Sequence, residues 1–108
     1  MKAGARIEMK ITVKFFASVR EIVGKKEETI ELPEGATVET VLQKLVQNYG
    51  PKFKDYVYDE KLQTPRNHLQ FLVDGRSVTT LEGIKTQLRD GNQFAIIPPV
   101  GGGKKGGP

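Results

Sequence analysis

The stretch MKITVKFFASVREIVG, residues 9–24, decides the fold of this chain. Apolar and polar residues alternate over residues 10–16, which is typical of a strand with one buried face. Residues 17–23 then change to a helical spacing, and Gly24 can end that helix in a left-handed conformation. The stretch therefore predicts a strand followed by a short helix. The buried face of the strand would carry Ile11, Val13 and Phe15.

The next residues predict a second strand and the main helix. Alternation over residues 28–32 ends at two breakers, Pro33 and Gly35. Thr37 then occupies a typical N-cap position, and Gly50-Pro51 can end the helix that follows it. The apolar residues of this helix share one face: Val38, Val41, Leu42, Leu45, Val46 and Tyr49.

The second half of the chain is less regular. Residues 52–67 mix aromatic and charged side chains, and we expect a long connection with at most one helical turn. Asp74-Gly75 favours a tight hairpin turn, and Asp90-Gly91 favours a second turn, whereas residues 81–88 show no clear pattern. The expected strands around these turns are residues 69–73, 76–79 and 93–98.

This order of elements predicts an α+β fold, a β-grasp, in which one main helix lies across a mixed sheet. The first and last strands, both rich in Val, Ile and Phe, would pair in parallel at the centre. We expect an N-terminal extension over residues 1–8, a β-grasp domain over residues 9–100, and a flexible glycine-rich tail over residues 101–108.

Composition excludes several classes of function. A chain of 108 residues supports one domain. Its net charge of +4 is dispersed among acids, which argues against a nucleic-acid partner, and no apolar run could span a membrane. The absence of cysteine excludes thiolate chemistry, and the single histidine, His68, makes a metal site improbable. No secretory signal opens the sequence, so we expect a cytoplasmic protein.

Three segments in this order resemble the MoaD family, the small subunit of molybdopterin synthase. They are VKFFASVREIVG at residues 13–24, DGNQFAIIPPV at residues 90–100, and the glycine run that follows at residues 101–103. The resemblance covers residues 9–103, with residues 52–88 matched loosely. ThiS and the small archaeal modifier proteins are related to this family and share its diglycine end.

The resemblance implies a ubiquitin-like sulfur carrier that is not itself an enzyme and binds no cofactor. A MoeB-like partner would use ATP and Mg²⁺ to adenylate the C-terminal carboxylate, and a sulfur donor would then convert it to a thiocarboxylate. A MoaE-like large subunit would receive this sulfur for molybdopterin, in molybdenum cofactor biosynthesis. Glycine suits such a tail because it adds no side chain beside the reacting carbonyl.

The working end of the tail is assigned from its spacing behind the last strand. The family's diglycine end corresponds to Gly103, with Gly101 and Gly102 before it. This chain continues for five more residues, so a peptidase would have to expose Gly103. Removal of Pro108 alone would instead leave the second diglycine, Gly106 and Gly107, as the end.

Strand parity predicts where partners bind. If Ile11, Val13 and Phe15 face the helix, three other apolar side chains point elsewhere and could form an exposed patch: Phe16, Leu72 and Ile97. The exit segment Pro98-Pro99-Val100 extends this predicted partner-binding surface.

Other functions remain open at this point. The same activated glycine could be joined to lysines of target proteins, as in a ubiquitin-like modifier, or could carry sulfur for thiamine or for tRNA thiolation. The chain could also be a binding module whose glycine tail is inert. Tyr49, Tyr56 and Tyr58 are expected to pack in the core or at its rim rather than stack on nucleobases.

Overall fold

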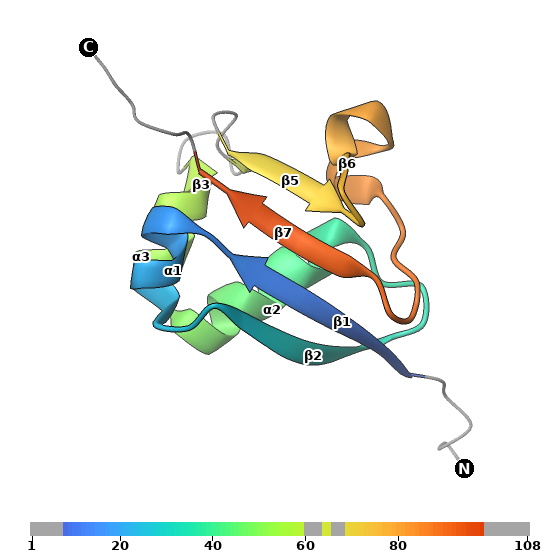
Figure 1. Cartoon of the computed structure of the whole chain (residues 1–108), viewed down its shortest axis with the longest axis horizontal. Coiled ribbons are helices and arrows are strands. Elements are labelled where there is room, and N and C mark those ends of the chain that lie inside the picture. Colours follow the sequence, from blue (N-terminus) through green and yellow to red (C-terminus); the bar gives the residue numbers. More distant parts are fainter. Residues whose placement is uncertain (1–7, 60–63, 66–68, 99–108) are drawn as a thin grey trace.

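The computed structural model describes residues 8–59, 64–65 and 69–98, and shows a mixed sheet with the longest helix lying across one face (Figure 1). The strands are β1 (Glu8–Phe15), β2 (Glu27–Pro33), β3 (Tyr58–Asp59), β4 (Thr64–Pro65), β5 (Gln70–Val73), β6 (Arg76–Ser77) and β7 (Gln93–Ile97). The helices are α1 (Ala17–Val23), α2 (Val38–Tyr49) and α3 (Pro51–Val57), with 3-10 turns η1 (Val78–Thr80) and η2 (Gly83–Lys85).

The main sheet has the strand order β2-β1-β7-β5-β6, so β7 is its central strand. β1 pairs with β2 in antiparallel and with β7 in parallel, and β7 pairs with β5 in antiparallel. The predicted parallel pairing of the first and last strands is thus confirmed, as is the α+β, β-grasp class. β1 begins at Glu8, the last residue assigned from the sequence to the N-terminal extension.

The core lies between the sheet and α2. Ile11, Val13 and Phe15 are fully buried, as the alternation of β1 predicts. Leu45 of α2 is also fully buried. The other buried residues of α2 are Val38, Val41 and Leu42.

The ends of the first two helices follow the signals in the sequence. Gly24 ends α1 in a left-handed conformation, with φ of 88°. Thr37 caps α2: its hydroxyl accepts from the Thr40 backbone N–H, and the Thr40 hydroxyl accepts from the Thr37 backbone N–H. This reciprocal arrangement satisfies two donors that a helix start otherwise leaves unpaired.

The predicted long connection over residues 52–67 was wrong in its first part, which forms α3 and then β3. Phe53, Tyr56 and Val57 lie three and four positions apart, a helical spacing, and Phe53 and Val57 are fully buried. Pro51, interpreted as the stop of α2, also occupies the first turn of α3, where proline is favoured. Gly50 alone thus separates α2 from α3.

The expected strand over residues 76–79 was too long, because only Arg76–Ser77 pair with β5. The chain then turns into η1, where the Ser77 hydroxyl accepts from the Thr79 backbone N–H. The unclear segment over residues 81–88 contains η2.

Candidate functional site

The candidate site lies where the central strand ends, at the place from which the C-terminal tail departs. Ile96 of β7 is fully buried and is the register partner of Phe15 on β1 and of Phe71 on β5. Pro98 follows β7 and is also buried, so the sheet holds the chain up to the last described residue. Seven predicted site residues lie outside the described residues: Pro99, Val100, Gly101, Gly102, Gly103, Gly106 and Gly107. So does His68.

Three apolar side chains outside the core lie on or next to the strands that meet here, and we call Phe16, Leu72 and Ile97 the apolar patch. Phe16 is 37% exposed, and among the described residues it is the one large hydrophobic residue that is exposed rather than buried or half-buried. Leu72 and Ile97 are half-buried, whereas their strand neighbours Phe71 and Ile96 are buried. Parity therefore places Leu72 and Ile97 on the sheet face away from the core.

The register brings the members of the apolar patch to neighbouring positions. Leu72 is the partner of Ala95, which lies two residues before Ile97 on the same face of β7. Phe15 of β1 is the register partner of Ile96 on β7, so Phe16, the next residue along the chain, lies beside Ile97. Ala95, which is half-buried, belongs to this surface as well. The sequence analysis did not single it out, although its position two residues before Ile97 places both side chains on the same face of the strand.

The backbone between β1 and α1 presents Phe16 to solvent. Ala17 adopts φ of 52°, a left-handed conformation rare for alanine, which turns the chain sharply after Phe16. The Phe16 carbonyl accepts from the Val19 N–H at 3.1 Å and so closes the first turn of α1. Arg20 donates from Nε to the Phe15 carbonyl at 3.2 Å, and its guanidinium carbon lies 6.0 Å from the centroid of the Phe16 ring.

The titratable side chains bear on what chemistry the described part of the chain can carry out. Across the described residues no three His, Cys, Asp or Glu side chains gather as a metal site would require, and no helix is long and apolar enough to span a membrane. Burial raises the pKa of Tyr49, and the Glu28 carboxylate raises it further. Burial also raises the pKa of Tyr58, with a smaller contribution from the Glu39 charge.

The ThiS family matches residues 13–103 of this chain. Small archaeal modifier protein 3 of Haloferax volcanii is 35% identical over 88% of this chain and 100% of its own length. The molybdopterin synthase sulfur carrier subunit of Chlamydomonas reinhardtii is 33% identical, over 88% of this chain and 100% of its own length.

The fold has close structural counterparts as well. The solution structure of small archaeal modifier protein 1 from Methanosarcina acetivorans superposes with a TM-score of 0.75 at 32% identity, over 90% of this chain and 99% of that one. A match that spans most of the sequence, and relatives above 30% identity that it covers along their full length, establish the family. The chain belongs to the ThiS family, the ubiquitin-like group of small sulfur carriers and protein modifiers.

Proposed function

We propose that this protein is a MoaD-like sulfur carrier for molybdenum cofactor biosynthesis, and that processed Gly103 is its working end. The observation that carries the proposal is the extent of the family match, which covers the glycine run and ends at residue 103. The relative from Chlamydomonas reinhardtii, named a molybdopterin synthase sulfur carrier subunit, supports the pathway. We place the reaction in the cytoplasm.

In this proposal the partner supplies the catalytic groups and the carrier supplies the reacting carbon. The Gly103 carboxylate would attack the α-phosphate of ATP in a MoeB-like enzyme, which releases pyrophosphate and leaves an acyl-adenylate. A hydrosulfide-level sulfur donor would then attack the acyl carbon, which forms the carbon–sulfur bond, breaks the bond to AMP and leaves the thiocarboxylate. ATP and Mg²⁺ belong to the partner, whose charged groups stabilise the transition state, and the carrier itself binds no cofactor.

The apolar patch would dock these partners because two of its members, Phe16 and Ile97, lie at the end of β7, where the tail begins. From Pro99, a fully extended chain reaches ~13–14 Å to Gly103 and ~26–29 Å to Gly107. A partner bound to the apolar patch would therefore find a Gly103 terminus and a Gly107 terminus at very different distances from the sheet. The sulfur acceptor in this scheme is a MoaE-like subunit, and a peptidase would first remove residues 104–108.

A second function is favoured by a specific observation. The 35% identical relative is named a small archaeal modifier protein, and modifiers of this kind would join the same activated glycine to target lysines. A lysine amine would then displace AMP where the sulfur donor otherwise does. Sulfur carriage for thiamine or tRNA thiolation uses the same thiocarboxylate and differs only in the acceptor.

Mass spectrometry of the protein from its native cell distinguishes these functions. A chain ending at Gly103 with one oxygen exchanged for sulfur is the expected result for a carrier. Lysine branches that end in Gly-Gly would instead identify a modifier. An intact Pro108 on the whole population would contradict both, since a carboxylate held in a peptide bond cannot be activated.

A further inference from the structure

The corner between β1 and α1 holds a cation, Arg20, that contacts the two residues preceding the helix. Side chains of an α-helix point toward its N-terminus, so Arg20 lies over the turn that follows β1. Its Nε donates to the Phe15 carbonyl at 3.2 Å, and its guanidinium carbon lies 6.0 Å from the centroid of the Phe16 ring. One side chain thus connects the end of β1 to the exposed member of the apolar patch.

Phe15 and Phe16 differ in how firmly the fold holds them. Phe15 is fully buried, its N–H donates to the Lys26 carbonyl at 2.8 Å, and its ring meets Tyr49 edge to face. Phe16 is exposed, and in the described part of the chain its ring contacts no other aromatic ring. The cation–π partner of the Phe16 ring is the Arg20 guanidinium. Arg20 therefore joins a residue that the core fixes to a neighbour that the core does not fix.

The backbone of this corner is held by bonds that do not orient the Phe16 ring. Ala17 has φ of 52°, a left-handed conformation that persists only where surrounding contacts hold it. The Phe16 carbonyl accepts from the Val19 and Arg20 N–H groups, at 3.1 and 3.4 Å. These bonds fix the main chain, whereas the rotamer of Phe16 needs a contact to its side chain. Arg20 provides that contact.

The Arg20 guanidinium is not engaged by an acid. Among the ion pairs of the residues that the structure describes, none includes Arg20: they join Lys25 to Glu28 and Lys85 to Glu39. Arginine also has the right shape for this corner. Its planar group can donate from Nε along one edge and present a face to a ring, whereas the compact ammonium of lysine has no planar face.

We propose that Arg20 is a positioning residue for partner recognition, which holds the Phe16 ring in the orientation in which the apolar patch presents it. A partner then binds a surface that is already formed and does not have to order this side chain as it binds. This role rests on the proposed function, which makes the apolar patch a docking surface. Arg20 acts through Phe16 and not through a contact of its own with the partner.

The first test uses the free full-length chain, so its result does not depend on any partner. Three-bond coupling constants of the ¹³C,¹⁵N-labelled protein report whether the Phe16 side chain has one χ1 rotamer. A single rotamer is expected in the natural chain and averaged couplings in Arg20→Lys, with Phe15 unchanged in both. Arg89→Lys, the same substitution at an exposed arginine before β7, should have no effect. Averaged couplings of Phe16 in the natural chain, or a single rotamer in Arg20→Lys, would overturn the proposal.

The second test measures binding to the MoaE-like subunit that we propose as a partner. Arg20→Lys should weaken binding about two- to tenfold, the cost of ordering one side chain on association. It should cause no further loss in a chain that already carries Phe16→Ala, because there is then no ring to position. An equal loss in both backgrounds would show that Arg20 contacts the partner directly, and would contradict the positioning role.

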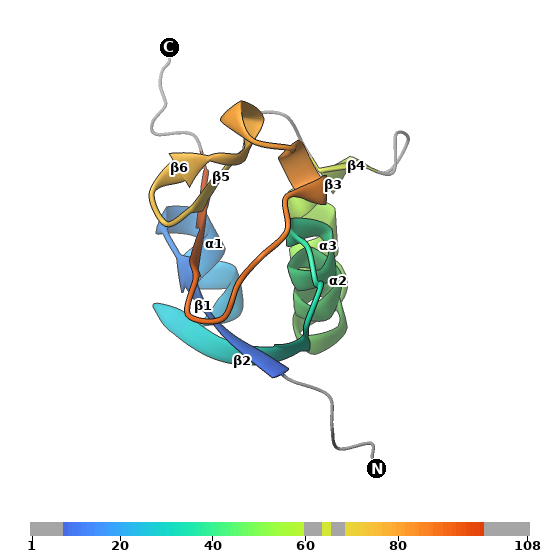
Figure 2. The same ribbon diagram turned by 90° about the vertical axis from the view of Figure 1, so that its right-hand side faces the viewer.

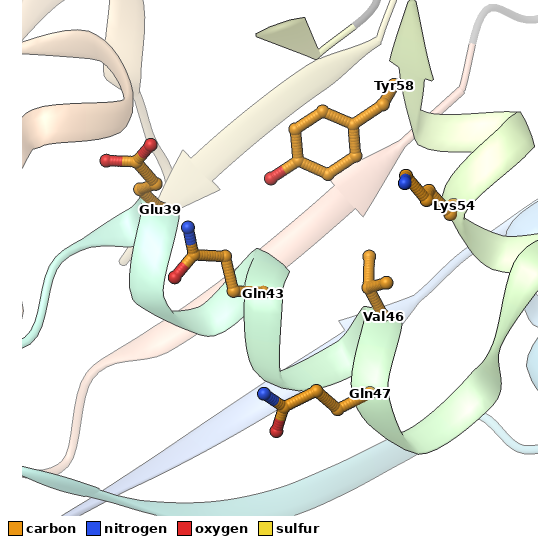
Figure 3. Close-up of a pocket in the computed structure, with 6 residues that line it drawn as sticks. All are labelled: Glu39, Gln43, Val46, Gln47, Lys54 and Tyr58. Carbon is orange, nitrogen blue, oxygen red and sulfur yellow. The ribbon is translucent and has the colours of Figure 1, made fainter. Parts of the chain in front are cut away.

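The control for binding lies on the other layer of the fold. The exposed Gln43 of α2 lines a groove of about 380 Å³ between α2 and α3, which Figure 3 shows. The sheet and these helices form different layers (Figure 2), so Gln43→Ala should leave the affinity unchanged. A loss equal to that of Arg20→Lys would overturn the proposal. A natural chain that does not bind the MoaE-like subunit would contradict the proposed function, and the rotamers of Phe16 would still decide the role of Arg20.

Discussion

At the scale of single residues, Leu45 shows how strongly one buried side chain supports the fold. Leu45 is fully buried on the face of α2 that packs on the sheet. Leu45→Ala should lower the free energy of unfolding by ~2–5 kcal/mol, because the lost contacts are joined by a cavity. Urea unfolding measures the change. Lys44→Ala, at the exposed neighbouring position, should change stability by less than about 0.5 kcal/mol. Similar losses in both variants would contradict a dry core at Leu45.

Phe16 differs from Leu45 because its side chain is presented to solvent. Phe16→Ala should lower thermal stability less than Leu45→Ala, because Phe16 is 37% exposed, but it should weaken binding of the MoaE-like subunit that we propose as a partner about tenfold or more, as expected for an aromatic anchor in an interface. Calorimetric titration of the two purified proteins measures the affinity, and Lys44→Ala is the control. An unchanged affinity would remove Phe16 from the docking surface.

At the scale of elements, the start of α2 depends on Thr37 and Thr40. Thr37→Ala removes the hydroxyl that accepts the Thr40 backbone N–H and should cost about 0.5–2 kcal/mol. Thr37→Ser keeps that oxygen and is the matched control. Chemical unfolding of both variants gives the comparison, and equal stabilities would show that the cap contributes nothing.

The end of α2 is tied to β2 by a hydrogen bond from the Tyr49 hydroxyl to the Glu28 carboxylate. The Tyr49 ring also meets Phe15 edge to face, with centroids 6.1 Å apart. Burial and Glu28 raise the pKa of Tyr49 above its unfolded value of about 10. The protonated phenol is therefore favoured in the folded state, and its contribution to stability is complete below about pH 10 and lost as pH rises further.

Unfolding measured from pH 7 to pH 11 checks this contribution. The stability difference between the natural chain and Tyr49→Phe should be constant up to about pH 10 and shrink above it. Glu28→Gln keeps an acceptor but removes the charge, and should reduce the decline. A difference that stays constant up to pH 11 would show that the pKa is not raised.

At the scale of the whole molecule, the proposed function makes the length of the tail beyond β7 decisive. A chain ending at Gly103 should form an ATP-dependent AMP adduct with the cognate MoeB-like enzyme, whereas one ending at Gly107 should react at least about tenfold more slowly, because it is about 13 Å longer at full extension. Intact-mass kinetics measure both. The chain that ends at residue 103 and carries Gly103→Ala is the control, because it keeps the length of the tail and changes only the terminal residue. Faster reaction of the Gly107 end would reassign the mature terminus.

The topology could be predicted because its signals are local. The alternation of Ile11, Val13 and Phe15 selects the buried face of β1, and Gly24 ends α1 because it accepts φ of 88°. α3 was missed although Phe53 and Val57 carry a helical spacing. That helix is only seven residues long, and the charges and the proline around it suggested a loop.

The sequence by itself determined the order of most elements along the chain, the side of the sheet on which Leu72 and Ile97 lie, and the glycine-rich end, because residue periodicity and motif spacing are properties of a continuous segment. Only the tertiary structure decided that Ala95 lies beside Leu72 and that Glu39 meets Lys85, 46 positions away. Such groups meet through the pairing of strands and the packing of helices, and no local pattern records which distant surfaces will fit together.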